Sequence, residues 1–308
     1  MATALQEAPV RESGPAQVRP RRRLGGKVFF VGFPFAVLFV LIFYPMCYLV
    51  YEAFTGTSRL YYDAHGFGAV FLRVLGSEIF HSALYNTLVI AILSTLCCLL
   101  LGFVLATIVS FIPFPGSPVL SRLIDAYLSF PSFLIAMSFT FLYGANGLVN
   151  GALEAVFGTD SPPLGNFVNS RWAVILAIVT FYTPFVIRPL LAAFSQLDTA
   201  VIEAASSLGA RPMRIIRKVI FPEAVPALLA GGSLTLVLTL NEFGIVAMIG
   251  AKGVTTLTLQ IYGQAIINND GAVAAVMAVV NVVLSLGLYA LYRSVLNRSG
   301  GASRARAQ

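Results

Sequence analysis

The stretch LYNTLVIAILSTLCCLLLGFVLATIVSF, residues 84–111, decides the fold class. It carries no charged side chain and is long enough to cross the hydrocarbon core of a bilayer, for which a helix needs about 20 apolar residues. Five further stretches meet the same requirement: residues 28–51, 122–143, 172–191, 226–249 and 272–292. The sequence therefore predicts an all-α, polytopic membrane protein with six transmembrane helices.

The overall composition supports this assignment. Hydrophobic residues make up 58% of the 308 residues and charged residues 11%, whereas soluble domains carry about 25% charged residues. Pro34, Pro45, Pro131 and Pro184 fall inside the expected spans, where neighbouring helices can satisfy the backbone groups that a proline leaves free. We therefore expect the spans to pack together as a bundle.

Lys and Arg are distributed unevenly between alternate loops, and positive residues are retained on the cytoplasmic side of a membrane. With both termini inside, sixteen of the 20 Lys and Arg residues are cytoplasmic and four are outside. The outside residues are Arg59, Arg73, Arg171 and Lys252. We predict cytoplasmic termini, and we interpret the net charge of +7 as a sign of topology and not of nucleic-acid binding.

The expected spans divide the chain into four parts. Residues 1–27 have too few apolar groups to pack, and we expect a disordered, basic cytoplasmic tail. The following apolar run is longer than a signal-peptide core and lacks a small-x-small cleavage site, so it should remain as an anchor. We assign residues 28–81 to the first transmembrane helix and an external segment, 82–292 to the main transmembrane domain and 293–308 to a cytoplasmic tail.

Residue types that support catalysis or metal binding are sparse. Cys47, Cys97 and Cys98 lie inside apolar runs, and we interpret them as buried small hydrophobic residues. His65 and His81 both fall in the first outside segment, without zinc spacing or a triad. The sequence contains no G-x-x-x-x-G-K-[ST] nucleotide-binding loop. We therefore expect no catalytic residue, metal or cofactor in this chain, so that ATP hydrolysis must come from a partner.

The longest expected cytoplasmic loop, about residues 192–225, contains the sequence IEAASSLGARP at residues 202–212. Glycine suits a helix end and proline a first helical turn, so we expect two short helices joined by a bend between Gly209 and Pro212. In the second helix apolar residues share one side and basic residues the other, a pattern that is equally typical of a helix on the membrane surface. The apolar set is Ile215, Ile216, Val219 and Ile220, and the basic set is Arg211, Arg214, Arg217 and Lys218.

The amino-acid sequence of this loop resembles the EAA loop of the permease subunits of type I binding-protein-dependent ABC importers. The resemblance rests on Glu-Ala-Ala, on a glycine four residues later, and on an apolar-x-apolar-Pro ending. Val219 and Phe221 replace the isoleucine and leucine that are common in the family, and both keep the apolar character. The resemblance implies that the coupling loop to the ATPase is formed by Glu203, Ala204, Ala205, Gly209, Val219 and Pro222.

The resemblance also implies a set of partners in a bacterial inner membrane. These are a cytoplasmic ABC ATPase dimer that binds ATP and Mg, a second permease subunit of the same or a related chain, an extracytoplasmic solute-binding protein and membrane lipid. Residues 82–292 then form the importer domain, and closure of the ATPases moves the permeases as rigid bodies. For Glu203 we prefer a cap or salt bridge within the bend over pairing with a basic group on the partner.

Asn241, Glu242 and Phe243 form a second candidate site, deep in the fifth expected span and similar to the Glu-Phe-Gly of several family members. A mid-membrane acidic group costs about 2.5–3.5 kcal/mol on insertion scales, so Glu242 should face protein or water. It is our candidate for the translocation path or gate. The alternative is a protonated or hydrogen-bonded side chain that only holds helices together. Asp125 and Arg188 are assigned no role beyond placement near helix ends.

The substrate is suggested by resemblance alone. Residues 190–194, 203–209, 227–232 and 241–253 are similar to permeases for 2-aminoethylphosphonate uptake. Polyamine, ferric-ion, sulfate and molybdate permeases share much of this pattern and remain alternatives. A secondary transporter is a more distant alternative, because no internal repeat is visible. A receptor or structural membrane protein would explain the spans but not the loop. Since no Lys or Arg lies in mid-span, we expect a passage with weak affinity for the solute.

Overall fold

The computed structural model describes residues 24–112, 114–158, 161–165 and 167–304. Every regular element in these residues is helical, and six helical stretches are long and apolar enough to cross a membrane. The all-α class and the number of spans are thus confirmed for the described part of the chain, while the cytoplasmic placement of the termini stays a prediction. The six stretches are Gly32–Thr55, Glu78–Phe111, Ser132–Phe157, Arg171–Phe194, Pro212–Leu240 and Gly271–Ser294.

The chain divides into two units, residues 1–48 and 49–308. The described part of the first unit is helix α1 (Leu24–Thr55), whose last residues belong to the second unit. The expected disordered tail falls mostly outside the described residues. Helix α1 nevertheless begins at Leu24, so the last residues assigned to the tail are helical.

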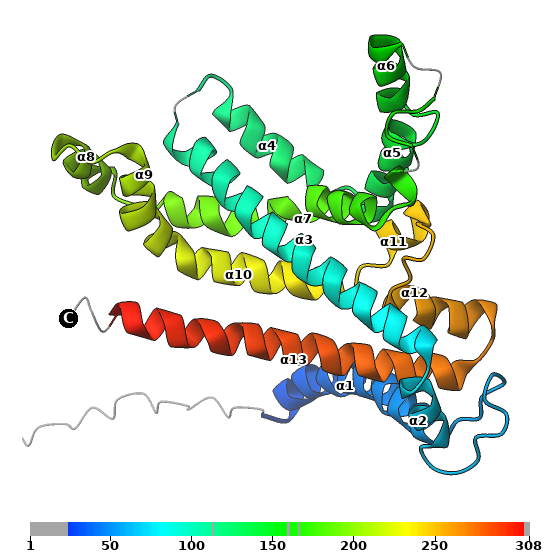
Figure 1. Cartoon of the computed structure of the whole chain (residues 1–308). Helices are drawn as coiled ribbons and strands as arrows, with labels where there is room; N and C mark the ends of the chain where they lie inside the picture. The colour runs from blue at the N-terminus through cyan, green and yellow to red at the C-terminus, as the bar shows by residue number, and fades with distance from the viewer. Residues whose placement is uncertain (1–23, 113, 159–160, 166, 305–308) are drawn as a thin grey trace, which may run out of the picture. The chain divides into compact units, whose positions relative to one another are not determined.

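The second unit contains the remaining helices (Figure 1). Helices α8 and α9 lie at one end of the paired helices α7 and α10, and α11 and α12 lie at the other end. The elements are α2 (Ala69–Leu75), α3 (Glu78–Phe111), α4 (Ser117–Tyr127), α5 (Ser132–Tyr143), α6 (Leu148–Phe157), the 3₁₀ helix η1 (Phe167–Asn169), α7 (Arg171–Phe194), α8 (Thr199–Ser207), α9 (Pro212–Ile215), the π-helix η2 (Ile216–Ile220), α10 (Phe221–Leu240), α11 (Gly244–Ile249), α12 (Leu257–Tyr262), the π-helix η3 (Gly263–Ile267) and α13 (Gly271–Arg304).

Helices α3, α7 and α10 pack against one another and form the centre of the second unit. Helix α7 is largely apolar and is the most deeply buried of the six candidate spans. Two glycines bring its neighbours close to Val186: a Cβ at Gly102 of α3 would lie 2.7 Å from Val186 Cγ1, and one at Gly231 of α10 would lie 3.0 Å from Val186 Cα. Small residues at such contacts let membrane helices approach closely.

Gly102→Ala is therefore expected to destabilise the bundle by about 1–3 kcal/mol, because the new methyl group overlaps the branched Val186 side chain. The thermal unfolding midpoint of the detergent-solubilised chain measures the effect. Gly287→Ala on α13 is the matched control, since nothing lies within 4 Å of the added Cβ. An unchanged midpoint for Gly102→Ala would show that α3 and α7 tolerate a wider spacing.

The expected third span, residues 122–143, is wrong as a single helix. Helix α4 ends at Tyr127 and α5 begins at Ser132, so the third candidate span is Ser132–Phe157. The break coincides with Pro131, whose φ of −63° and ψ of 140° are extended. Proline donates no backbone hydrogen bond and disfavours helical geometry in the residue before it, which explains the interruption.

The expected fifth span, residues 226–249, is also interrupted. Its helix begins earlier, because α9 and η2 continue directly into α10, and α10 ends at Leu240. Residues 241–243 are not helical, and α11 begins at Gly244. The last helix, α13, extends to Arg304, beyond the residue 292 at which we expected the span to end.

Asp270 joins the N-terminus of α13 to the segment after α1 within the second unit. It is 2% exposed, and its Oδ2 accepts hydrogen bonds from Ser58 Oγ at 2.7 Å, Arg59 N at 2.9 Å and Leu60 N at 3.0 Å. Its Oδ1 accepts from Val273 N at 3.3 Å, which caps α13. A buried carboxylate that receives several donors fixes the position of the segment that supplies them.

Asp270→Ala should lower the unfolding free energy by about 2–4 kcal/mol, because the buried Ser58 hydroxyl and two part-buried main-chain N–H groups lose their acceptor. Ser58→Ala removes one of these donors and keeps the carboxylate, so its loss should be about 1 kcal/mol. Thermal unfolding of the purified chain compares the two variants. Equal losses would mean that the carboxylate is not the centre of this network.

Candidate functional site

The coupling loop forms the two short helices that the sequence predicts. Helix α8 is capped at its start by Asp198, whose Oδ1 accepts from Ala200 N at 2.9 Å. It ends in a bend in which Gly209 has a φ of 77°, in the left-handed region that favours glycine. The bend is closed by a hydrogen bond from Ala210 N to Ala205 O at 3.1 Å, and α9 begins at Pro212.

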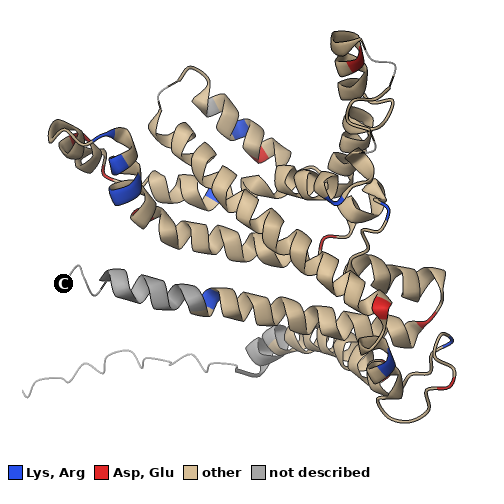
Figure 2. Ribbon diagram, viewed as in Figure 1, with Lys and Arg blue, Asp and Glu red and all other residues tan. Residues whose placement is uncertain are grey.

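The segment after the bend presents two different sides, as its periodicity indicates. Ile215 and Ile220 are buried and belong to the core of the second unit, against which Ile216 and Val219 also pack. The apolar side of this segment therefore packs on protein, whereas contact of its basic side with membrane lipid stays a prediction. The basic side is exposed, and Figure 2 shows Lys and Arg gathered on this segment while the long helices carry few charges. The exposed basic residues are Arg211, Arg214, Arg217 and Lys218.

Several side chains of the loop are exposed on its surface. Glu203 and Ala204 are exposed, Leu208 is 89% exposed, and Met213 is 71% exposed. Among the described residues Glu203 forms no salt bridge. The cap of α8 is supplied by Asp198 instead. The preferred intramolecular role of Glu203 is therefore not seen in this structure.

Three of the sequence-predicted loop residues play structural parts. Ala205 is half-buried and supplies the carbonyl that closes the bend, and Val219 packs on the core. Pro222 is exposed and lies in the first turn of α10, where its missing N–H falls at the junction with the π-helix η2. Such π-helical turns are rare and are often found at functional sites.

Glu242 lies at the break between α10 and α11 and is 6% exposed. Its Oε1 accepts hydrogen bonds from Ile245 N at 2.8 Å and from Ser132 Oγ at 3.2 Å, and its Oε2 accepts from the Tyr182 hydroxyl. Its main-chain oxygen accepts from Thr258 Oγ1 at 3.0 Å. The single residue thus joins α5, α7, α11 and α12, and its side chain faces protein and not lipid.

The two neighbours of Glu242 contact α13 and α12. Asn241 is exposed, donates from Nδ2 to Ser285 Oγ at 3.2 Å, and accepts at Oδ1 from Asn281 Nδ2 at 3.0 Å, so that it contacts α13. Phe243 is half-buried, with its ring centre 5.0 Å from that of Tyr262 at the end of α12. The three candidate gate residues form one non-helical segment, and their side chains contact different helices.

Several contacts of this site were not predicted from the sequence. Tyr182 and Ser132, which donate to Glu242, carry no local signal of that role because they are distant from it along the chain. Asp125 and Arg188, which were assigned no role, form an ion pair between α4 and α7. Both side chains are about half exposed, and such pairs add little stability.

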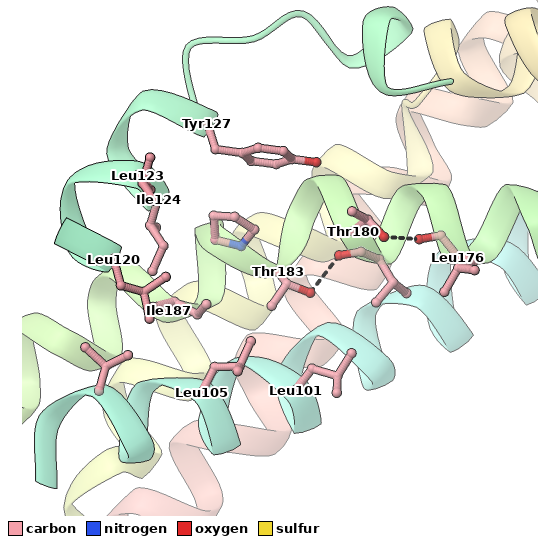
Figure 3. Close-up of a pocket in the computed structure, with 13 residues that line it drawn as sticks. Leu101, Leu105, Leu120, Leu123, Ile124, Tyr127, Leu176, Thr180, Thr183 and Ile187 are labelled. Carbon is pink, nitrogen blue, oxygen red and sulfur yellow. Dashed lines mark hydrogen bonds between the residues drawn. The ribbon is translucent and has the colours of Figure 1, made fainter. Parts of the chain in front are cut away.

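A pocket of about 430 Å³ lies between α3, α4 and α7, but it lacks the groups that would fix a charged solute (Figure 3). Its only hydroxyl groups other than that of Tyr127 donate within α7: Thr180 to Leu176 O at 2.8 Å and Thr183 to Val179 O at 2.6 Å. The remaining lining is apolar. Within the described residues, no three His, Cys, Asp or Glu side chains lie close enough to hold a metal ion.

Comparison with known proteins identifies relatives of the chain. It is 49% identical over 271 residues to the permease PhnU of Salmonella typhimurium strain LT2, a protein named for a proposed role in 2-aminoethylphosphonate transport; the match covers 87% of this chain and 91% of that protein. It is 27% identical over 227 residues to the spermidine/putrescine permease PotB of Haemophilus influenzae, covering 73% of this chain and 79% of PotB.

Solved structures show the same fold. The chain superimposes on a bacterial ABC transporter involved in alginate import with a TM-score of 0.73 at 18% identity, covering 90% of this chain and 99% of that one. Residues 98–299 match the family described as binding-protein-dependent transport system inner membrane component. With six candidate spans in its described residues, the chain belongs to this family of multi-pass bacterial inner-membrane permeases of ABC importers.

Proposed function

We propose that this chain carries 2-aminoethylphosphonate, or a similar phosphonate, from a solute-binding protein into the cytoplasm. The observation that supports the substrate is the 49% identity to PhnU, which extends over 87% of the chain. The importer domain is assigned to residues 82–292, close to the matched residues 98–299. The chain itself performs no chemistry; ATP and Mg are bound by a partner ATPase dimer, and a second permease completes the passage.

The coupling step is proposed to start at the exposed loop. Glu203, Ala204 and Leu208 offer the partner ATPase one charged, one small and one large apolar contact. Because Glu203 has no salt bridge among the described residues, we propose that it forms one with a basic group of the ATPase. The Gly209 bend leaves open space around its Cα, so that a partner backbone can approach.

The structure of α10 suggests how movement of the loop reaches the gate. The helical stretch Pro212–Leu240 contains 29 residues, a length of about 43 Å at 1.5 Å per residue. It begins directly after the loop bend and ends beside Glu242, with the π-helix η2 in its first part. A rigid helix transmits a displacement at one end to the other, as in rocking or hinge movements. We assign the gate to residues 241–243, with Glu242 as the pivot.

Solute-stimulated ATP hydrolysis tests this function. The full-length chain is reconstituted in proteoliposomes with the ATPase and solute-binding protein encoded beside it, and 2-aminoethylphosphonate, putrescine and sulfate are supplied in turn. Stimulation and uptake with the phosphonate alone support the proposal. Stimulation by putrescine or sulfate alone contradicts the substrate assignment, and uptake that follows an ion gradient without ATP contradicts the importer mechanism.

A further inference from the structure

Arg171 lies where α7 begins, at the end of that helix away from the coupling loop. Arg171 donates from Nη2 to Asn86 Oδ1 at 2.7 Å, and its guanidinium carbon lies 5.4 Å from the centre of the Tyr85 ring. Its Nε is buried and has no hydrogen-bond partner in the described part of the chain. No carboxylate among the described residues forms an ion pair with it. Arg171 is therefore a fixed, half-buried positive charge that no described acidic side chain neutralises.

The residue that Arg171 contacts also holds a loop in place. Asn86 is 2% exposed, and its Nδ2 donates to Thr255 O at 3.0 Å and, more weakly, to Gly253 O at 3.4 Å. Next to it, Thr87 Oγ1 accepts a hydrogen bond from Leu257 N at 2.8 Å. Helix α3 thus fixes residues 253–257 through two buried polar side chains, and we call these contacts the Asn86 latch.

The latched segment continues to the proposed gate. Thr258, the next residue after the latch, donates from Oγ1 to the main-chain oxygen of Glu242 at 3.0 Å. Hydrogen bonds therefore connect Arg171, through Asn86 and residues 255–258, to the break at the end of α10. A change in the hydrogen bond of Arg171 can therefore alter the position of Glu242 through these contacts.

We infer that Arg171 receives the oxyanion group of the solute, of the phosphonate class, and that its binding loosens the Asn86 latch. The inference rests on the proposed function. A guanidinium forms two parallel hydrogen bonds with a phosphonate, and these charge-assisted bonds are stronger than one bond to an amide oxygen. Nη2 then exchanges Asn86 for the anion, while Nε supplies the second donor. Asn86 loses the contact that orients its amide toward residues 253 and 255.

The neighbouring residue offers a direct probe. Trp172 is the single tryptophan of the chain and is 62% exposed. The full-length chain in lipid nanodiscs is titrated with methylphosphonate, with inorganic phosphate and with ethanolamine, which carries the amine without the oxyanion. We expect a saturable change in Trp172 fluorescence with both oxyanions and none with ethanolamine.

Matched variants distinguish specific binding at Arg171 from non-specific attraction of the anion to positive surface charge. Arg171→Gln should weaken methylphosphonate binding by about tenfold or more, as expected for a lost charge-assisted hydrogen bond. Arg171→Lys should weaken it less, because an ammonium group keeps the charge but not the parallel pair. Lys252→Gln removes the same charge from an exposed position next to Gly253 in the chain and should stay within about threefold of wild type. An equal loss in Arg171→Gln and Lys252→Gln, or none in either, overturns the site.

Hydrogen exchange tests the latch itself. Methylphosphonate should increase amide exchange in residues 253–258 of wild type, above all at Leu257, and should not do so in Arg171→Gln. Unchanged exchange in wild type, despite binding, overturns the latch. Uptake by the complete importer distinguishes this inference from the proposed function: phosphonate uptake without Arg171-dependent binding overturns the inference alone. Arg171-dependent binding without phosphonate uptake overturns the proposed substrate and leaves an oxyanion site.

Discussion

Gly209→Asp is expected to reduce solute-stimulated ATP hydrolysis of the reconstituted importer by at least tenfold, while the chain still inserts and folds. Gly209 is exposed, has a φ of 77°, and would place a Cβ in open space. Aspartate is among the residues that tolerate this conformation best, so the strain within the chain is about 1–2 kcal/mol. The larger effect arises at the ATPase, where the added side chain opposes close approach of the partner backbone. A tenfold loss corresponds to about 1.4 kcal/mol of coupling free energy.

The matched control for this prediction is Gly158→Asp. Gly158 ends α6, has a φ of 63°, and also has nothing within 4 Å of an added Cβ. The same substitution in the same backbone conformation should therefore leave ATP hydrolysis nearly unchanged. Copurification of the ATPase with each variant separates failed assembly from failed coupling. If Gly209→Asp assembles and hydrolyses ATP like Gly158→Asp, the loop is not the coupling element.

The fold could be predicted from the sequence where hydrophobicity alone decides it. Runs of apolar residues such as 84–111 specify membrane helices, because the bilayer forces the backbone to satisfy its own hydrogen bonds. The interruptions were not predicted. Pro131 was placed inside a span, since membrane helices tolerate proline, yet the chain breaks there into α4 and α5. Whether a proline is tolerated depends on neighbouring helices, which hydropathy does not reveal.

The candidate site could be predicted in its local features and not in its long-range contacts. The bend at Gly209 and the start of α9 at Pro212 follow from backbone preferences that are read directly from residue types. The partners of Glu242 depend on how α5 and α7 pack. No short-range sequence pattern predicts that Tyr182 contacts Glu242, which lies 60 residues further along the chain. The sequence signals that a buried acid needs partners, but tertiary packing selects them.

Glu242→Leu is expected to lower phosphonate uptake by more than tenfold and to reduce the thermal stability of the assembled chain. Leucine enters a membrane more easily than glutamate by about 3 kcal/mol on insertion scales, so insertion is not the step that suffers. The loss occurs in the folded bundle, where Ile245 N, Ser132 Oγ and the Tyr182 hydroxyl lose their acceptor. At about 1–3 kcal/mol for each buried group left without a partner, loss of the acceptor lowers the stability of the folded bundle.

Two further variants decide whether Glu242 acts as a pivot or as a contact for the solute. Tyr182→Phe removes one donor but leaves the bonds from Ile245 and Ser132, so a pivot predicts a small loss of both stability and uptake. Glu242→Gln keeps an oxygen acceptor and removes the negative charge, and a pivot predicts intermediate losses that again change together. Thermal unfolding and uptake, measured on the same preparations, provide the comparison. If Glu242→Gln abolishes uptake while its unfolding midpoint stays at the wild-type value, the charge itself serves the passage, and the pivot assignment is wrong.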